Sequence, residues 1–306
     1  MFDTLILGSG PAGMSAAIYA SRAKLSFVVI EKEDGGTGQI KSTSYVDNYP
    51  GLPKISGLKL GQAIREHAVS LGVEFLSAEV SAIEKQEDEN GKSFFRVHLN
   101  GKDQAPLESK TIVYALGAEH RLLNIPGEED LIGAGVCFCS VCDGPFFEGL
   151  NVAVFGGGNS ALGDALHLSG IAEKVYLVHR REGFRANASV VEKVRNTENI
   201  ELVLNAVPER FEGEDELEAV VLKDGRRIEI QGAFVAVGML PRTELIKDFV
   251  ALDKAGYVAA EETGVTNVPG FYAAGDVRAK SLRQVITAAS DGAVVIHNIT
   301  EYLQSY

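Results

Sequence analysis

Two cysteines separated by two residues are the side chains of this sequence best suited to redox chemistry. Cys139 and Cys142 enclose Ser140 and Val141, and an acid, Asp143, follows the second cysteine directly. A Cys-x-x-Cys pair can close into a small disulphide ring and open again, because such pairs favour thiolates and thiol–disulphide exchange. The motif therefore predicts a redox-active dithiol.

The third cysteine and the histidines give little support for a metal site. Cys137 lies close to the pair, and two interpretations stay open: it is a small buried residue, or it takes part in the exchange. Zinc needs about four ligands, and only His120 lies near the cysteines in sequence, so we predict no metal.

Three cysteines do not make a secreted disulphide framework, and no signal-peptide pattern is seen, which favours the cytoplasm.

A glycine-rich turn near the N-terminus predicts a dinucleotide site. It lies between the apolar run 4–7 and an alanine-rich helical stretch, and its sequence is Gly8-Ser9-Gly10-Pro11-Ala12-Gly13. In such a unit the first glycine makes the tight turn, the second lets the backbone approach a pyrophosphate, and the third lets helix pack on strand. The N–H groups at the helix start suit phosphates. Glu31, after the next apolar run, lies where a free ribose 2′-hydroxyl is held, which favours FAD.

The same layout returns in the middle of the chain. The apolar run 152–155 leads into Gly156-Gly157-Gly158-Asn159-Ser160-Ala161. His179 follows Gly156 by 23 residues, the interval that also separates Glu31 from Gly8. A second βαβ unit with a nucleotide site is therefore expected here.

The ribose position of the second unit has the opposite polarity. Arg180 and Arg181 follow His179 directly, and Arg185 lies close behind. Guanidinium groups form forked bonds with phosphate oxygens, so this cluster suits the 2′-phosphate of NADPH. The alternative is a solvated basic face, which is less expected in a chain with a net charge of -13.

Each unit continues with a charged, hairpin-like stretch, around 87–92 in the first unit and 223–227 in the second. An apolar strand that ends in glycine follows each stretch, over 111–118 and 233–238 respectively. The segment 271–289 is too short for a domain and would complete the first unit. We therefore predict an α/β chain with two Rossmann-like three-layer nucleotide-binding domains, the NADPH domain inserted into the FAD domain. The FAD domain would comprise 1–117 and 243–306, and the NADPH domain 118–242 would carry the cysteine pair. A cysteine pair between two nucleotide sites predicts an electron relay from nicotinamide through flavin to a disulphide.

Composition excludes other classes of function. The net charge of -13 argues against a nucleic-acid partner. No apolar run reaches membrane-spanning length, so no membrane association is expected.

Along nearly its whole length the sequence resembles the bacterial-type, low-molecular-weight thioredoxin reductases. Besides the two glycine turns, the matching segments are Asn48-Tyr49-Pro50-Gly51, Cys139-Ser140-Val141-Cys142-Asp143-Gly144, 179–186, Gly275-Asp276-Val277 and Arg283-Gln284. The resemblance implies a homodimer that binds FAD non-covalently, takes hydride from NADPH and reduces the disulphide of thioredoxin or a thioredoxin-like protein.

The resemblance also implies roles for single residues. Cys142 would face the flavin, Cys139 would attack the thioredoxin disulphide, and Asp143 would act as the acid–base group. The expected FAD contacts are Gly8, Gly10, Pro11, Ala12, Gly13, Glu31, Gln39, Asn48, Gly117, Gly275, Asp276, Arg283, Gln284 and Val285. The expected NADPH contacts are Gly156, Gly158, Asn159, Ser160, Ala161, His179, Arg180, Arg181 and Arg185.

Besides Cys137, an extra thiol close to the pair, one position and one loop depart from the family pattern, and several rival functions remain. Gly163 stands where the family often has Glu, and the loop 35–39 departs from the usual Gly-Gly-Gln. A related flavoprotein fed by ferredoxin or flavodoxin should lack the arginine cluster, and a small-molecule dithiol oxidase should use oxygen rather than NADPH. An FAD-binding redox sensor without turnover is disfavoured by the intact Cys-x-x-Cys-Asp motif.

Overall fold

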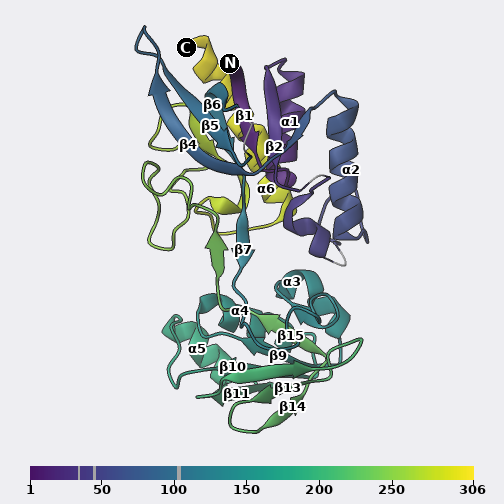
Figure 1. Ribbon diagram of the computed structural model, residues 1–306. Helices are drawn as coiled ribbons and strands as arrows, with labels where there is room; N and C mark the ends of the chain where they lie inside the picture. The colour runs from purple at the N-terminus through teal and green to yellow at the C-terminus, as the bar shows by residue number, and fades with distance from the viewer. Residues whose placement is uncertain (34, 44–45, 102–104) are drawn as a thin grey trace. The chain divides into compact units, whose positions relative to one another are not determined.

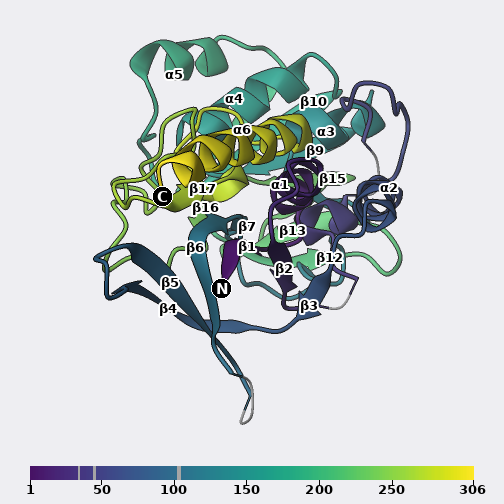
Figure 2. The ribbon, with the colours of Figure 1, turned by 90° about the horizontal axis from the view of Figure 1, so that it is seen from above.

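The computed structural model describes residues 1–33, 35–43, 46–101 and 105–306. This part of the chain forms two compact units, coloured by position along the chain in Figures 1 and 2. Met1–Glu119 and Leu240–Tyr306 make the first unit, and His120–Met239 makes the second. The second unit is thus inserted into the first, and the predicted fold class is confirmed.

The first unit is built on a sheet with strand order β3-β2-β1-β6-β5-β4, and β17 also pairs with β6. Its strands are β1 (Phe2–Leu7), β2 (Phe27–Glu31), β3 (Phe75–Ser77), β4 (Val80–Glu87), β5 (Ser93–Leu99), β6 (Leu107–Tyr114) and β17 (Phe271–Ala273). The pairings among β3, β2, β1, β6 and β17 are parallel, whereas β4 and β5 add an antiparallel hairpin. The short β17 completes the nucleotide-binding sheet from the far end of the chain.

The α-helices in the described part of this unit are α1 (Pro11–Arg22), α2 (Gly57–Ser70) and α6 (Val285–Gln304). Helices α1 and α6 lie side by side in Figure 2. Their approach is close because residue 292 has no side chain: a Cβ at Gly292 would lie 2.2 Å from the carbonyl oxygen of Ala12. This packing brings the beginning of α1, and with it the first glycine turn, against the C-terminal segment.

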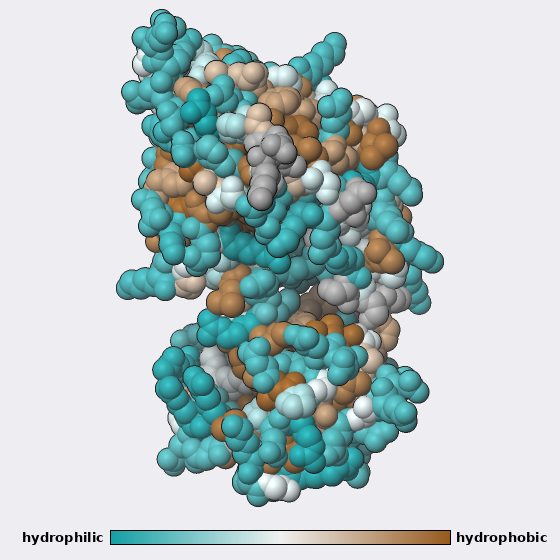
Figure 3. Space-filling view, viewed as in Figure 1, coloured by the Kyte–Doolittle hydropathy of each residue, from teal (hydrophilic) through white to brown (hydrophobic). Residues whose placement is uncertain are grey.

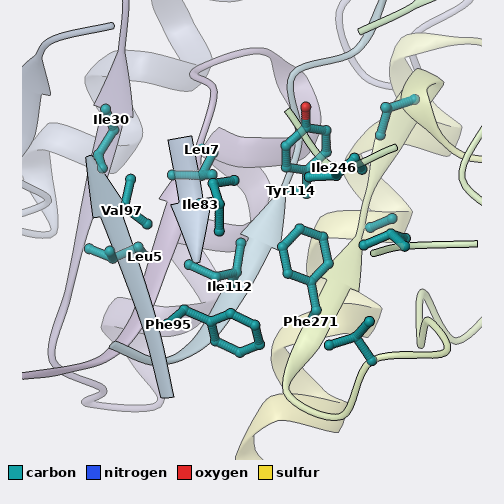
Figure 4. Close-up of a cluster of buried hydrophobic side chains, with 14 of the residues drawn as sticks. Leu5, Leu7, Ile30, Ile83, Phe95, Val97, Ile112, Tyr114, Ile246 and Phe271 are labelled. Atoms are coloured by element: carbon teal, nitrogen blue, oxygen red, sulfur yellow. The ribbon is translucent and has the colours of Figure 1, made fainter. Parts of the chain in front are cut away.

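One face of the same sheet carries a large hydrophobic core. Figure 4 shows Leu5, Phe95, Tyr114 and Phe271 among its buried side chains. The rings of Phe95 and Phe271 meet edge to face with centroids 5.7 Å apart. Strand β1, which leads into the first glycine turn, therefore packs against aromatic and aliphatic side chains.

The second unit contains an all-parallel sheet with strand order β11-β10-β9-β15-β8. Its strands are β8 (Val136–Cys137), β9 (Asn151–Phe155), β10 (Lys174–His179), β11 (Ile200–Leu204) and β15 (Gly232–Val235). The helices are α3 (Ser140–Asp143), α4 (Asn159–Ser169) and α5 (Ala188–Arg195), and a separate antiparallel sheet comprises β12 (Pro208–Glu212), β13 (Ala219–Leu222) and β14 (Arg227–Glu229). Strands β7 (Ala118–His120) and β16 (Met239–Pro241) pair where the chain passes between the units.

Hydrophilic residues cover most of the molecular face drawn in Figure 3. Across the described ranges, no helix combines the length and the apolar character needed to cross a membrane.

Candidate active site

The cysteine pair closes a disulphide on a single helical turn. Cys139 is the residue that precedes α3, and Cys142 lies within it, which brings their Cα atoms to 5.2 Å. The sulphur of Cys139 accepts a hydrogen bond from the backbone N–H of Cys142 at 3.2 Å. The predicted spacing therefore forms the small ring that reversible exchange requires.

Asp143 is held beside this ring by backbone and side-chain contacts. Its N–H donates to the carbonyl oxygen of Cys139 at 2.9 Å. Burial raises the pKa of the Asp143 carboxyl to about 6, against the opposing effect of hydrogen bonds from the Cys137 thiol and the Cys139 backbone. A carboxyl with a pKa near neutrality can both give and take a proton at physiological pH.

Cys137 is the buried partner of Asp143 rather than an exposed thiol. It is 9% exposed on strand β8, opposite Phe234 of β15. Burial and the neighbouring Asp143 carboxylate raise the pKa of its thiol far above the ordinary value. Only the thiolate is a good nucleophile, so this sulphur is poorly suited to exchange and well suited to donate a hydrogen bond.

A second carboxylate fixes the turn between the cysteines. The hydroxyl of Ser140, a residue that is 2% exposed, donates to Asp164 Oδ1 at 2.5 Å. Asp164 lies on α4, the helix that follows the second glycine turn, and burial raises the pKa of its carboxyl. No sequence motif marks Asp164, so sequence reasoning missed this link between the dithiol and the second glycine unit.

The two glycine turns have the same local geometry. Gly8 and Gly156 both adopt positive φ, at +106° and +155°. A Cβ at either position would lie 2.5 Å from a carbonyl oxygen of the return strand, that of Ala115 in the first unit and of Ala236 in the second. Both positions therefore require glycine, as the sequence predicted.

The last glycine before the helix in each turn, Gly10 or Gly158, leaves open space, as approach by a pyrophosphate requires. A Cβ at Gly158 would meet no atom within 4 Å, and one at Gly10 would meet only Gly38 Cα at 3.9 Å. Both residues immediately precede a helix, α4 and α1 respectively, so backbone N–H groups follow at once. This combination suits a phosphate group at each turn.

His179 packs on the second turn, and three arginines surround it. A Cβ at Gly157 would lie 2.1 Å from Cε1 of the His179 ring, and that ring also stacks on Phe184 with centroids 5.4 Å apart. Burial lowers the pKa of His179, and the charges of the neighbouring arginines lower it further. Its buried Nε2 has no hydrogen-bond partner in the described part of the chain.

The arginine cluster is available for an anion. The side chains of Arg180, Arg181 and Arg185 are exposed. Within the described ranges, no ion pair is observed for any of the three. The backbone N–H of Arg185 donates to Gly157 O at 2.7 Å, which places this segment beside the glycine turn.

Several of the dispersed residues expected to bind FAD come together in the first unit. Asn48 Nδ2 donates to Gln284 Oε1 at 2.9 Å, although 236 residues separate them. A Cβ at Gly275 would lie 2.8 Å from Cβ of Ala12 in the first glycine turn. Gln284 directly precedes α6, and Val285 is the first residue of that helix.

Asp276 contributes an unpaired oxygen to this group. Its Oδ1 is buried and has no hydrogen-bond partner among the described residues, and burial raises the pKa of the carboxyl. The guanidinium of Arg283 lies 4.0 Å from the centroid of the Tyr257 ring and donates to the backbone oxygen of Asp276 at 3.4 Å. A buried acceptor of this kind fits a ligand hydroxyl, as the ribityl chain of FAD would supply.

A buried ion-pair cluster that the sequence did not reveal supports the Gly275–Asp276 turn. Asp291 of α6 accepts the N–H of Gly275 at 2.9 Å and pairs with Arg278 at 3.0 Å and Lys280 at 2.9 Å. Both cationic side chains are nearly inaccessible, with exposures of 2% and 4%. Asp291 therefore fixes the backbone that carries Asp276.

Three further residues expected to bind FAD lie elsewhere in the first unit. Glu31 ends β2 and is bound by Arg65 of α2. Gln39 lies in the short 3-10 helix Gly38–Ser42, and Gly117 follows β6 with a φ of +72°.

Comparison with known proteins finds similarity that extends over the whole chain. Residues 2–292 match the family described as pyridine nucleotide-disulphide oxidoreductase. A thioredoxin reductase from Listeria monocytogenes is 37% identical over 99% of this chain and 94% of its own length, and one from Bacillus subtilis is 36% identical over 99% and 95%. The crystal structure of thioredoxin reductase from Streptococcus pyogenes superimposes with a TM-score of 0.92 at 37% identity, covering 100% of this chain and 99% of that one.

Proposed function

The chain belongs to the pyridine nucleotide-disulphide oxidoreductase family, and we propose that it works there as an NADPH-dependent thioredoxin reductase. Electrons pass from NADPH through FAD and the Cys139–Cys142 pair to the disulphide of thioredoxin. The observation that carries the proposal is the Cys139–Cys142 disulphide at α3, with Asp143 beside it. Full-length similarity to thioredoxin reductases agrees with this assignment.

We assign the proposed FAD domain, residues 1–117 and 243–306, to the first unit. Three observations support FAD here: the open position at Gly10, the buried unpaired oxygen of Asp276 and the acidic ribose position at Glu31. Gln39, Asn48, Gly117 and Gln284 are assigned to the same cofactor.

Residues 118–242 form the proposed NADPH domain, which also carries the dithiol. Gly158 leaves room for the pyrophosphate, and the exposed guanidinium groups of Arg180, Arg181 and Arg185 suit the 2′-phosphate. Asn159, Ser160 and Ala161 begin the helix whose N–H groups would face the phosphates.

FAD, when bound, supplies the two-electron carrier between nicotinamide and the disulphide. Two electrons open the Cys139–Cys142 bond, and Asp143, with a pKa of about 6, exchanges the proton that one of the two thiols gains. The Cys139 thiolate then attacks the thioredoxin disulphide, which forms a mixed disulphide and releases one thioredoxin sulphur as thiolate. Cys142 attacks Cys139 in turn, which restores the enzyme disulphide and frees reduced thioredoxin.

Partner and compartment follow from this role. The protein is proposed to act in the cytoplasm as a homodimer, with thioredoxin or a thioredoxin-like protein as its acceptor and without nucleic-acid or membrane partners. The test is the initial rate at which thioredoxin thiols form, with NADPH, NADH or reduced ferredoxin as the electron donor in separate reactions. A further reaction supplies NADPH and oxygen without thioredoxin and follows NADPH oxidation. NADPH-dependent turnover supports the proposal, whereas turnover with ferredoxin alone would contradict the donor assignment.

A further inference from the structure

Arg65 of α2 binds both carboxylate oxygens of Glu31. Its Nη2 donates to Glu31 Oε1 at 2.7 Å, and its Nη1 donates to Glu31 Oε2 at 2.8 Å. The two side chains are 17% and 2% exposed. This forked geometry is the strong, directional form of an arginine–carboxylate pair, and little solvent is present to weaken it.

The guanidinium itself is fixed by two further contacts. Nη1 also donates to the carbonyl oxygen of Gly36 at 3.1 Å, and the guanidinium carbon lies 3.9 Å from the centroid of the Phe75 ring. Phe75 is the first residue of β3, the strand that pairs with the end of β2. Arg65 thus joins a helix, a loop and an edge strand around one carboxylate.

From this arrangement we infer that Arg65 is a positioning residue for the adenosine ribose of FAD, acting through Glu31. A carboxylate offers about four lone-pair positions, and the fork takes two of them. The other two suit the adjacent hydroxyls of a ribose. The inference rests on the proposed function, because it takes FAD to be the ligand of the first unit.

The pairing also makes the site electrostatically compatible with FAD. Glu31 is a buried carboxylate at the ribose end of a site that must accept an anionic pyrophosphate. A buried charge without a partner is costly, and a second negative charge nearby adds repulsion. The Arg65 guanidinium offsets the charge of Glu31 while its oxygens remain acceptors.

A double-mutant cycle tests whether Arg65 acts through Glu31. The variants are Arg65→Met, Glu31→Gln and the combination, and the measurement is the FAD dissociation constant, obtained by dialysing the holoenzymes against a series of FAD concentrations. Arg65→Met and Glu31→Gln should each weaken FAD binding about tenfold or more. The combined variant should bind FAD no more than about twofold more weakly than Glu31→Gln, because residues that act as a unit are not additive.

Controls separate this inference from folding and from the proposed function. Lys59→Met removes an exposed cation from the same helix and should leave FAD binding unchanged. Arg65→Lys keeps the positive charge but cannot form both hydrogen bonds to Glu31 in the same geometry, so it should also weaken FAD binding. This variant replaces Arg65→Met in the cycle if Arg65→Met does not fold. Wild-type affinity in both Arg65 variants, or fully additive losses, would overturn the inference. Wild-type protein without any flavin would instead overturn the proposed cofactor.

Discussion

The thiol of Cys137 donates a hydrogen bond to the carboxylate of Asp143, the acid that follows the redox-active pair. Cys137 precedes the dithiol in sequence and Asp143 follows it, and this hydrogen bond links their side chains. Burial raises the pKa of Asp143, whereas the bond from Cys137 favours the charged carboxylate and restrains that rise. Cys137 therefore lowers the pKa of Asp143 relative to burial alone, while its own thiol stays protonated.

Replacing Asp143 should remove an ionisation from the enzyme. With a pKa of about 6, Asp143 is largely deprotonated at pH 7 and largely protonated at pH 5. Asp143→Asn should lower thioredoxin turnover about 10²-fold or more. The wild-type pH–rate profile should show an apparent pKa near this value that is lost in the variant.

The same variant should change stability in a defined pH window. The pKa of Asp143 is higher in the folded protein than its ordinary value of 3.8, so its contribution to stability is present below about pH 4 and is lost as the pH rises through about 6. The free energy of unfolding of wild type, relative to Asp143→Asn, should therefore fall across this window. Urea unfolding at several pH values measures the difference, and a constant difference would show that the carboxyl pKa is not raised.

Cys137 gives a prediction that separates it from the exchanging pair. Cys137→Ala removes a donor to the carboxylate and should move the acid limb of the pH–rate profile to higher pH, whereas Cys137→Ser keeps a donor and should stay close to wild type. A colorimetric thiol reagent should detect almost no free thiol in the folded oxidised protein and one after denaturation, because Cys137 is buried. Rapid reaction of Cys137 in the folded protein would favour a role in exchange instead.

The bond between Ser140 and Asp164 should stabilise the dithiol turn. Asp164→Ala leaves the buried Ser140 hydroxyl without a carboxylate acceptor, which should cost about 1–3 kcal/mol of unfolding free energy. Asp164→Asn retains an acceptor oxygen and is the matched control. Equal stability of the alanine variant and wild type in urea unfolding would show that this bond contributes nothing.

The arginine cluster should decide the choice of nicotinamide donor. Charge-assisted forked bonds to phosphate are worth about 1.5–3 kcal/mol each, so Arg180→Ala together with Arg181→Ala should raise KM for NADPH by about an order of magnitude or more. KM for NADH should barely change. Arg195→Ala, an exposed arginine on α5, is the control. A wild-type preference for NADH would contradict the assignment, and Gly163 would then be the first position to investigate.

Local patterns made the fold and the glycine turns predictable. The runs 4–7 and 152–155 lie within β1 and β9, and Gly8 and Gly156 have the geometry that the motif requires, since these features depend on neighbours in sequence. The charged stretches around 87–92 and 223–227, expected to be hairpins, connect β4 to β5 and β13 to β14. Fold class therefore followed from periodicity and turn residues alone.

The contacts that support the predicted residues were not predictable in the same way. Arg65 lies 34 residues from Glu31 and Asp164 lies 24 residues from Ser140, and neither belongs to a motif. Asp291 reaches the Gly275 turn from α6, the helix that packs closely on α1 at Gly292. Such side chains resemble ordinary helix residues until tertiary packing assigns each one a partner.

The central claim is that electrons reach thioredoxin through Cys139 and Cys142, and the two Cys→Ser variants test it most directly. In each variant NADPH should still reduce the flavin in an anaerobic stopped-flow experiment, because that step precedes the dithiol. Steady-state reduction of thioredoxin should be abolished in both, since one sulphur cannot close the ring. Cys142→Ser should in addition retain thioredoxin as a mixed disulphide on Cys139, visible on a non-reducing gel. Flavin reduction without thioredoxin turnover in both variants is the predicted result, and full turnover in either one would contradict the account.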